Sequence, residues 1–367
     1  MDIIEATYVA TRPAGDPEKL ARAIAREQTV ECVEELISDA IGERYLGRVA
    51  AVEHLDDERV SIVIDYPQAA AGGDLSALIQ LLYGNVSFYP RIRLTRVRLP
   101  DAIYQRLPPV RAGLPGIRER LGVGGRALLG AVLKPRGSAV AELAARAEAF
   151  AAGGGDILKD DQNLVDDDLD GFRTRVGACA EAVRRGAARS GKPCLYLPFA
   201  GGAGPALDSR LACIAAEGLP GVVLCGFILG LETAAECAQR HELMWMCHPA
   251  AAGAWTEPDA HGIAPEVVFG TLVRAAGADI CNFPAAGGRI APGRPADAAI
   301  IRELIGPVPD RPPTLPCLAG GMTLDRLAGL AQEFGPDCML LVGGDLMRTG
   351  ERIEALTRNA IAALERP

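Results

Sequence analysis

The feature that most constrains the fold of this chain is an alternation of short apolar segments with alanine-rich helical segments, which begins near Gly124 and continues to the C-terminus. The apolar segments have the length and composition of buried strands, and helical composition separates them. The predicted strands cover residues 128–133, 156–158, 194–197, 221–225, 244–247, 278–283, 314–318 and 339–342. The predicted helices include residues 139–152, 172–190, 209–217, 233–240, 265–276, 295–304 and 324–334. Eight strand–helix units within about 240 residues are typical of a (β/α)8 TIM barrel.

A doubly wound open sheet is the alternative fold for such an alternation. Eight units are many for an open sheet, and a dinucleotide-binding version would carry Gly-x-Gly-x-x-Gly after its first strand. Residues 130–134 read Gly-Ala-Val-Leu-Lys and do not supply that motif. The barrel is therefore the favoured prediction.

The N-terminal part of the chain has a different pattern, in which strand-like and helix-like segments are mixed. Residues 3–11, 48–53, 60–66 and 87–99 read as strands, and residues 16–25 and 75–83 read as helices. Asp16 is a suitable helix cap and Pro17 a suitable first-turn residue. We expect a small α+β domain of the ferredoxin-like kind over residues 1–115, with the barrel over residues 116–367.

Composition limits the classes of partner. The net charge of -9 argues against nucleic acid, since phosphate backbones bind to basic faces. No apolar run is long enough to span a membrane, and Asp2 and Glu5 lie where a signal peptide would be basic. The ten cysteines form no Cys-x-x-Cys pair, so we expect a reduced, cytoplasmic protein.

Residues capable of chemistry or anion binding follow six of the eight predicted strands. They are Lys134 and Arg136, then Lys159 to Gln162, His248, Arg289, the pair Gly320 and Gly321, and the pair Gly343 and Gly344. Each has an ordinary structural explanation when taken alone, such as a charged strand end or a tight turn. In a barrel, however, all six positions face the same mouth, where active sites lie. We therefore interpret them as one site.

These residue types together favour one kind of chemistry. Backbone N–H groups of the two glycine pairs could hold a phosphate, as loops after the last two barrel strands often do. Asp161 offers a hard oxygen ligand suited to Mg²⁺. Lysines beside such a site can act as acid/base groups when burial lowers their pKa. The combination predicts proton abstraction next to a carbonyl, with the enolate stabilised by positive charge.

The order of these motifs resembles that of the RuBisCO large-subunit superfamily over nearly the whole chain. Residues 130–136 are similar to its Gly-x-x-x-Lys-Pro-Lys strand, and residues 154–161 to its Gly-Gly-x-Asp-x-x-Lys-Asp-Asp-Glu metal motif. Residues 319–321 and 342–344 resemble its two phosphate loops. Residues 27–29 and 84–86 resemble N-terminal segments that reach the active site of the neighbouring subunit.

The resemblance implies a role for each matching residue. It implies a barrel in an obligate homodimer with active sites at the subunit interface, to which Glu27 and Asn85 of the neighbouring subunit contribute. Lys134 would be the catalytic acid/base, and His248 would lie beside the substrate. Lys159, carbamylated, would bind Mg²⁺ with Asp161 and with Gln162 at the third ligand position. Arg136, Arg289 and the two glycine pairs would bind the substrate and its phosphate.

Departures from the family pattern narrow the activity. Gln162 replaces a metal-binding Glu, which would weaken Mg²⁺, and Pro249 stands in place of a phosphate-binding Arg. Arg289 replaces a compact ammonium by a planar fork. Val132 replaces a Thr, residues 281–282 (Cys-Asn) lack an expected His, and the mobile loop is compressed to residues 287–292. Carboxylation of ribulose bisphosphate is therefore not expected, and the chain resembles the non-carboxylating, RuBisCO-like (form IV) branch.

Three functions stay open from the sequence. The favoured one is an isomerase or lyase that forms a metal-stabilised enol(ate) from a keto-sugar or keto-sugar acid with a single phosphate, by tautomerisation, isomerisation or decarboxylation. The second is a 2,3-diketo-5-methylthiopentyl-1-phosphate enolase of methionine salvage. The third is a catalytically silent dimer that binds a sugar phosphate and regulates another process.

Overall fold

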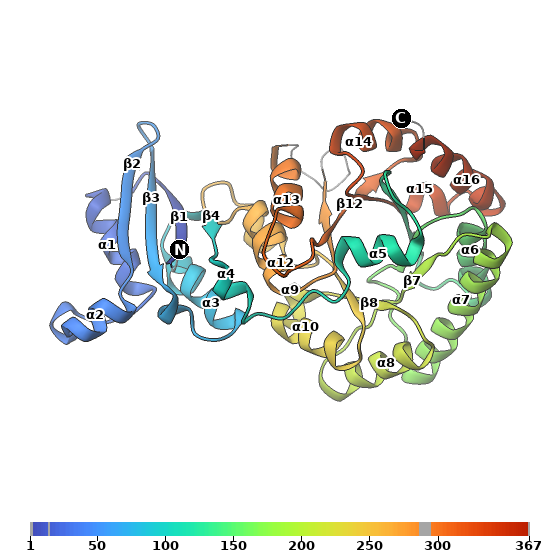
Figure 1. The fold of residues 1–367 in the computed structure, drawn as a ribbon, viewed down its shortest axis with the longest axis horizontal. Helices are drawn as coiled ribbons and strands as arrows, with labels where there is room; N and C mark the ends of the chain where they lie inside the picture. The colour runs from blue at the N-terminus through green and yellow to red at the C-terminus, as the bar shows by residue number, and fades with distance from the viewer. Residues whose placement is uncertain (1–2, 14, 286–294, 366–367) are drawn as a thin grey trace. The chain divides into compact units, whose positions relative to one another are not determined.

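The computed structural model describes residues 3–13, 15–285 and 295–365 (Figure 1). The chain forms two compact units, and each is described here by itself. The first contains residues 1–109, 251–276 and 308–311, and the second contains residues 110–250, 277–307 and 312–367. Within the described residues, no helix combines the length and the hydropathy needed to cross a membrane.

The first unit is built on a five-stranded sheet whose strands lie in the order β10-β4-β1-β3-β2. Four strands are antiparallel to their neighbours, and the short β10 pairs parallel to β4. The strands are β1 (Ile3–Thr11), β2 (Arg48–His54), β3 (Arg59–Pro67), β4 (Ile92–Arg98) and β10 (Gly262–Ile263). The helices are α1 (Pro17–Glu27), α2 (Asp39–Tyr45), α3 (Leu75–Tyr83), α4 (Asp101–Tyr104), α11 (Gly253–Thr256) and α12 (Val273–Ala275), and a π-helical segment, Glu266–Leu272, precedes α12.

Side-chain alternation explains this sheet. In β1 and β3 every second residue is buried, which gives the sheet one apolar face and one partly exposed face. Helix α1 begins as the sequence predicts, because the Asp16 carboxylate accepts a hydrogen bond from the Glu18 N–H and Pro17 occupies the first turn. The order of elements around the four antiparallel strands is the ferredoxin-like one, so the predicted α+β class is confirmed.

The second unit contains an eight-stranded parallel sheet in the order β7-β6-β5-β13-β12-β11-β9-β8. A parallel bridge between Phe199 and Val223 joins the two ends of that order and closes the sheet into a barrel. The strands are β5 (Leu128–Leu133), β6 (Ile157–Asp160), β7 (Leu195–Leu197), β8 (Gly221–Leu224), β9 (Met244–Cys247), β11 (Ile280–Pro284), β12 (Leu315–Met322) and β13 (Met339–Val342). All eight predicted strands are present, and the predicted barrel is confirmed.

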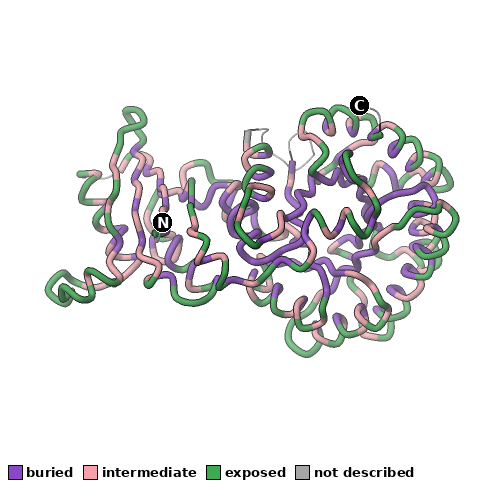
Figure 2. Tube along the Cα trace, in the orientation of Figure 1, coloured by how far each residue is buried: buried purple, intermediate pink, exposed green. Residues whose placement is uncertain are grey.

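Helices surround this sheet on its outer side (Figure 1). They are α6 (Val140–Ala152), α7 (Leu169–Ser190), α8 (Gly204–Ala216), α9 (Gly226–Leu229), α10 (Leu231–Arg240), α13 (Pro295–Ile305), α14 (Leu327–Phe334), α15 (Gly344–Met347) and α16 (Ile353–Leu364). Figure 2 shows the strands of this unit as its buried part and the outer sides of its helices as exposed. The strands therefore carry the core, and the strand ends carry the candidate site.

The barrel interior is a packed apolar core. Inward side chains from all eight strands form one cluster, which includes Ile157, Val223, Met244 and Leu341. Helix α5 (Gly113–Leu121) contributes three further apolar side chains to the same cluster. Gly130 makes room for this packing in β5, because a Cβ there would lie 2.8 Å from the Leu341 side chain, which would have to move. Such filling leaves room for polar chemistry only at the end of the barrel where the strands finish.

Candidate functional site

Lys134 and Asp161 meet at the C-terminal ends of two neighbouring strands, β5 and β6. Leu133 is paired with Asp160 across the two strands, and the Asp161 N–H donates to the Leu133 carbonyl at 3.1 Å. This register brings the Lys134 Nζ to 2.9 Å from Asp161 Oδ2. The two residues that the sequence places after separate strands therefore form an ion pair.

The Asp161 carboxylate is held from two sides. Its Oδ1 accepts a hydrogen bond from the Asn163 N–H at 3.0 Å, while Lys134 occupies Oδ2. Burial acts to raise the pKa of Asp161, but the Lys134 ammonium and the Asn163 N–H outweigh it and lower the pKa below its usual value. Asp161 is therefore ionised at neutral pH.

Lys159 points into the barrel from β6 and is only 2% exposed. Its Nζ donates to the carbonyl of Asp160 at 3.1 Å. Burial lowers the pKa of this amine, although the nearby Asp161 carboxylate opposes that effect. An amine that loses its proton more easily than an exposed lysine is chemically available at the floor of the mouth.

His248 follows β9 and is held as a neutral imidazole. Its backbone N–H donates to the Leu224 carbonyl at 2.8 Å, and its Nδ1 accepts a hydrogen bond from the Ala250 N–H at 3.2 Å. Burial, with the positive charge of Lys159, lowers the pKa of His248 to about 3. Because Nδ1 is an acceptor, the ring proton is assigned to Nε2, which leaves a neutral donor.

The two glycine pairs lie where the predicted phosphate loops should be. Gly320 and Gly321 have φ of 109° and 110°, and the β12–β13 pairing shifts register over this segment, so the backbone bulges out of the strand. A Cβ on Gly343 would lie 3.5 Å from the Lys134 Nζ, so this turn runs beside the ion pair. The Asp345 carboxylate accepts from the Leu324 N–H at 3.0 Å and ties the loops after β12 and β13 together.

The remaining predicted site residues are Arg136, Gln162, Arg289, Glu27 and Asn85. Arg136 is exposed on the loop after β5, and Gln162 is half-buried directly after Asp161. Arg289 lies outside the described residues. Glu27 and Asn85 lie in the first unit, where the Asn85 side-chain amide donates to the Glu27 carboxylate at 3.0 Å.

The residues predicted to hold Mg²⁺ do not by themselves make a metal site. Among the described residues, no group of three His, Cys, Asp or Glu side chains is arranged to hold a metal ion. The Asp161 carboxylate is engaged by Lys134 and Asn163, and Gln162 offers only a neutral amide oxygen. Lys159 as an amine is not a ligand for a hard cation. The donor set would fit Mg²⁺ only if a carbamate on Lys159 added the missing oxygens.

Sequence reasoning missed the residues that hold the site in place. The Arg146 guanidinium donates to the Lys134 carbonyl at 3.0 Å and to the Ser138 hydroxyl at 2.9 Å, which fixes the loop after β5. Asp345 and its contact with Leu324 were also missed. Neither residue belongs to a motif, and each partner is chosen by loop geometry that the sequence pattern does not encode.

The sequence and the structure of this chain are similar to those of known proteins. The family model described as the ribulose bisphosphate carboxylase large chain, catalytic domain, matches residues 113–301. The chain is 35% identical over 358 residues to ribulose bisphosphate carboxylase-like protein 1 of Rhodopseudomonas palustris, with 96% of both chains covered. It is 31% identical over 366 residues to 5-methylthioribulose-1-phosphate isomerase of Rhodospirillum rubrum, covering 99% of this chain and 96% of that one.

A third relative and a solved structure agree with these two. The chain is 29% identical over 363 residues to 2,3-diketo-5-methylthiopentyl-1-phosphate enolase of Geobacillus kaustophilus, covering 94% of this chain and 88% of that one. The crystal structure of a Rubisco-like protein from Rhodopseudomonas palustris superposes with a TM-score of 0.87 at 32% identity, covering 99% of this chain and 98% of that one. The chain therefore belongs to the RuBisCO large-chain family and, within it, to the RuBisCO-like proteins.

Proposed function

We propose that this protein is a non-carboxylating enzyme that transfers a proton next to the carbonyl group of a phosphorylated keto-sugar. The observation that carries the proposal is the contact between the Lys134 amine and the Asp161 carboxylate at the barrel mouth. A cation and a carboxylate in contact beside a glycine turn suit a reaction in which a carbonyl oxygen gains negative charge.

Each residue at the barrel mouth has its own role in this reaction. Lys134 exchanges a proton with the substrate, and Asp161 holds its amine in place until the substrate arrives. His248 donates a hydrogen bond from Nε2 without carrying charge. The backbone N–H groups of the two glycine pairs receive the phosphate, since Gly320 and Gly321 lie in the bulge near the end of β12, and Gly343 and Gly344 directly follow the neighbouring strand β13. Binding the phosphate there would fix the distance between the carbonyl carbon and Lys134.

The substrate class follows from the relatives and from the phosphate-binding groups. Two relatives are named for 5-methylthioribulose-1-phosphate and 2,3-diketo-5-methylthiopentyl-1-phosphate, both of which carry one phosphate. Pro249 removes a cation that a second phosphate would need. Isomerisation of a ketose 1-phosphate is our first assignment, with enolisation of the diketo compound and decarboxylation of a keto-sugar acid phosphate as the alternatives within the class.

In this proposal, Mg²⁺ binding requires a carbamate on Lys159. A carbamate would replace the amine by an anionic oxygen pair beside Asp161 and Gln162, and a metal held there would stabilise the negative oxygen of an enolate. Calorimetric titration of Mg²⁺ should show binding with bicarbonate present and none without it. Equal Mg²⁺ binding with and without bicarbonate would contradict the requirement for a carbamate.

The assembly is also part of the proposal. We infer a homodimer in which Glu27 and Asn85 of one subunit complete the mouth of the other. Their mutual hydrogen bond holds both polar groups in one place, and Phe88, three residues after Asn85, is 87% exposed. A large apolar side chain that is open to solvent often marks a surface that a partner covers.

A panel of phosphorylated ketoses tests the proposal. The panel contains both methylthio-sugar phosphates, a branched keto-sugar acid phosphate and the unphosphorylated methylthioribulose, each with and without Mg²⁺ and bicarbonate, read by phosphorus and proton NMR. We expect one phosphorylated member to be converted and its unphosphorylated counterpart to need a far higher concentration. If no member is converted while a phosphate ester still binds, the protein is the regulatory sugar-phosphate binder, which the engaged Asp161 and the neutral Gln162 favour as the second candidate.

A further inference from the structure

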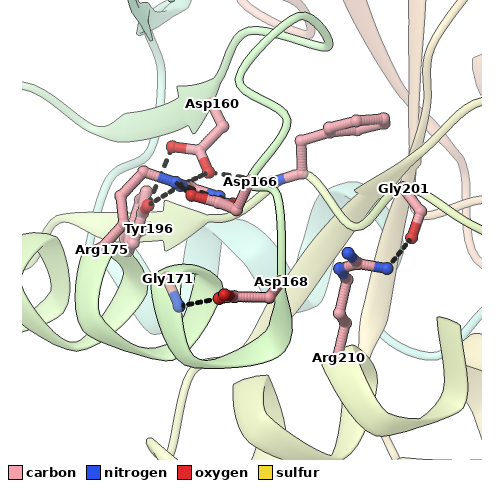
Figure 3. Close-up of polar contacts among 9 residues, drawn as sticks. Asp160, Asp166, Asp168, Gly171, Arg175, Tyr196, Gly201 and Arg210 are labelled. Carbon is pink, nitrogen blue, oxygen red and sulfur yellow. Dashed lines mark hydrogen bonds and ion pairs between the residues drawn. The ribbon is translucent and has the colours of Figure 1, made fainter. Parts of the chain in front are cut away.

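A buried polar network lies on the outer side of β6, at the strand end that leads into Asp161 (Figure 3). Its centre is Asp160, which is fully buried and points away from the barrel interior, opposite to Lys159. The Asp160 carboxylate accepts hydrogen bonds from the Tyr196 hydroxyl at 2.8 Å, from the Phe199 N–H at 3.1 Å and from the Arg175 guanidinium. One carboxylate therefore joins β6, β7 and α7.

Arg175 extends the network to the loop that carries Asp161. Its guanidinium donates to both carboxylate oxygens of Asp166, from Nε at 3.0 Å and from Nη2 at 2.8 Å. Asp166 lies on the far side of the loop that begins at Asp161, so Arg175 fixes that loop at both ends. Burial acts to lower the pKa of Arg175, but the Asp160 and Asp166 carboxylates raise it above its ordinary value.

The neighbouring loop is fixed through the same group of side chains. The Arg175 and Arg210 guanidiniums both lie over the Phe172 ring, at 5.5 Å and 5.8 Å from its centroid. Arg210 in turn donates to the Gly201 carbonyl at 3.2 Å, on the loop after β7 (Figure 3). The loops that follow two adjacent barrel strands are thus held by one connected set of contacts.

A second buried ion pair at the opposite end of the same strand offers a comparison. Asp156, just before β6, accepts from Arg126 at 2.7 Å and 2.9 Å and from the Leu129 N–H at 2.7 Å. Both carboxylates are buried, and both are bonded by an arginine and a backbone N–H of a neighbouring segment. They differ in position. Asp160 lies between Lys159 and Asp161 at the C-terminal end of β6, whereas Asp156 lies at the N-terminal end of that strand, away from the barrel mouth.

We propose that Asp160, Arg175 and Tyr196 are positioning residues that set the Asp161 carboxylate against the Lys134 amine. Buried charge pairs contribute little net stability, but they fix geometry strongly because an unpaired charge is so costly. A hydrogen-bonded shell of this kind around reacting groups holds them within a fraction of an ångström. The catalytic consequence rests on the proposed function, whereas the effect on the Lys134–Asp161 contact does not.

The lysine content of the chain allows a test that needs no substrate. Its four lysines are Lys19, Lys134, Lys159 and Lys192. Trace acetylation of the intact protein, followed by mass spectrometry, gives the reactivity of Lys134 relative to the exposed Lys19. In Asp160→Asn the loop loses a charged anchor, Asp161 moves from Lys134, and we expect the relative reactivity of Lys134 to rise about 3-fold or more.

Two further variants separate positioning from general loss of structure. Asp156→Asn makes the matched change at the other end of the strand and should leave the relative reactivity of Lys134 unchanged. Tyr196→Phe removes the hydroxyl that donates to Asp160 and accepts a longer hydrogen bond from Arg175 at 3.5 Å, with little change of shape. It should raise the relative reactivity of Lys134 in the same direction as Asp160→Asn, by less. An Asp160→Asn protein with wild-type Lys134 reactivity, or an equal change in Asp156→Asn, would overturn the proposal.

Steady-state kinetics on whichever ketose phosphate the wild type converts provide the second readout. A shift of the reacting groups by a fraction of an ångström should lower kcat by about 10-fold or more in Asp160→Asn and leave KM within about 2-fold. Raised Lys134 reactivity in a protein that converts no member of the panel would support the network and reject the proposed function. Unchanged kcat in Asp160→Asn together with raised reactivity would reject the catalytic role of the network.

Discussion

Single side chains at the barrel mouth have their charge states set by burial as much as by their partners. Asp161 stays ionised because Lys134 and a backbone N–H favour its charged form. Lys159 and His248 are both pushed toward their neutral forms by burial. A neutral imidazole and a reluctant ammonium next to an ionised carboxylate are three different states within one small mouth, which is the usual condition for acid/base chemistry.

The low pKa of His248 gives a stability prediction with a definite sign. Since the pKa is about 3 in the folded protein and 6.5 for an unperturbed histidine, the unfolded chain binds the proton more readily below pH 6.5. The stability from the neutral ring is therefore complete above pH 6.5 and is lost as the pH falls toward 3. Allowing for partial solvent exposure, we expect a loss of about 1 kcal/mol at pH 5.

His248→Gln removes this titration and keeps a polar side chain. Urea unfolding at pH 7 and at pH 5 should show that wild type loses about 1 kcal/mol more than the variant between the two values. Equal losses in both proteins would mean that His248 has the same pKa in the folded and unfolded states.

At the scale of elements, strands and helices could be predicted further than the contacts between them. All eight barrel strands were predicted because apolar runs alternate with helical segments, and their positions put Lys134 and Asp161 at one edge. Strand ends were less predictable. Strand β12 continues to Met322 through the Gly320–Gly321 bulge, and β6 includes Lys159 and Asp160, because hydrogen bonds to neighbouring strands decide where a strand stops.

Helix packing around the barrel gives a prediction with a matched control on one helix. Helices α6 and α7 approach closely at Gly186, where a Cβ would lie 2.4 Å from the Glu148 carbonyl oxygen. Gly186→Ala should therefore destabilise the protein by about 2 kcal/mol, since backbone cannot give way. Gly177→Ala on the same helix meets only the Glu217 side chain at 3.4 Å and should stabilise by up to about 1 kcal/mol through helix propensity.

Chemical unfolding of both variants measures the difference. Similar stabilities for Gly186→Ala and Gly177→Ala would show that α6 and α7 are not packed as closely as the structure has them.

At the scale of the whole molecule, the sequence predicted the family and the residues at the barrel mouth, but not the residues that hold them in place. The ordered motifs and the strand order fixed which residues converge. Asp160 shows the limit of motif reading. The motif places it in one strand-end group with Lys159 and Asp161, whereas strand alternation turns it outward to Arg175 and Tyr196. Arg146 and Asp345 match no motif, because the contacts by which they hold the loops include backbone groups, the Lys134 carbonyl and the Leu324 N–H, that any residue type offers.

The proposed dimer makes its own prediction. Lys134→Met and Asn85→Ala homodimers should each be nearly inactive if the mouth needs residues from both subunits. Co-expressed and purified as a mixed dimer, the two variants should recover up to about half of the activity per site, because one mouth of the pair is then intact. The measurement is the activity per dimer, with light scattering used to confirm the dimer's mass. Mixed dimers as inactive as their parents would show that Asn85 does not complete the mouth of the other subunit.

The measurement that tests the central claim most directly is proton exchange at carbon. In D2O, wild-type protein should incorporate deuterium at the carbon next to the carbonyl of 5-methylthioribulose 1-phosphate or of the diketo compound, followed by proton NMR. Lys134→Met should slow this exchange by about 100-fold or more, while Lys192→Met, which alters an exposed lysine at a surface ion pair with Glu365, should leave it unchanged. Exchange at the wild-type rate in Lys134→Met would contradict the account.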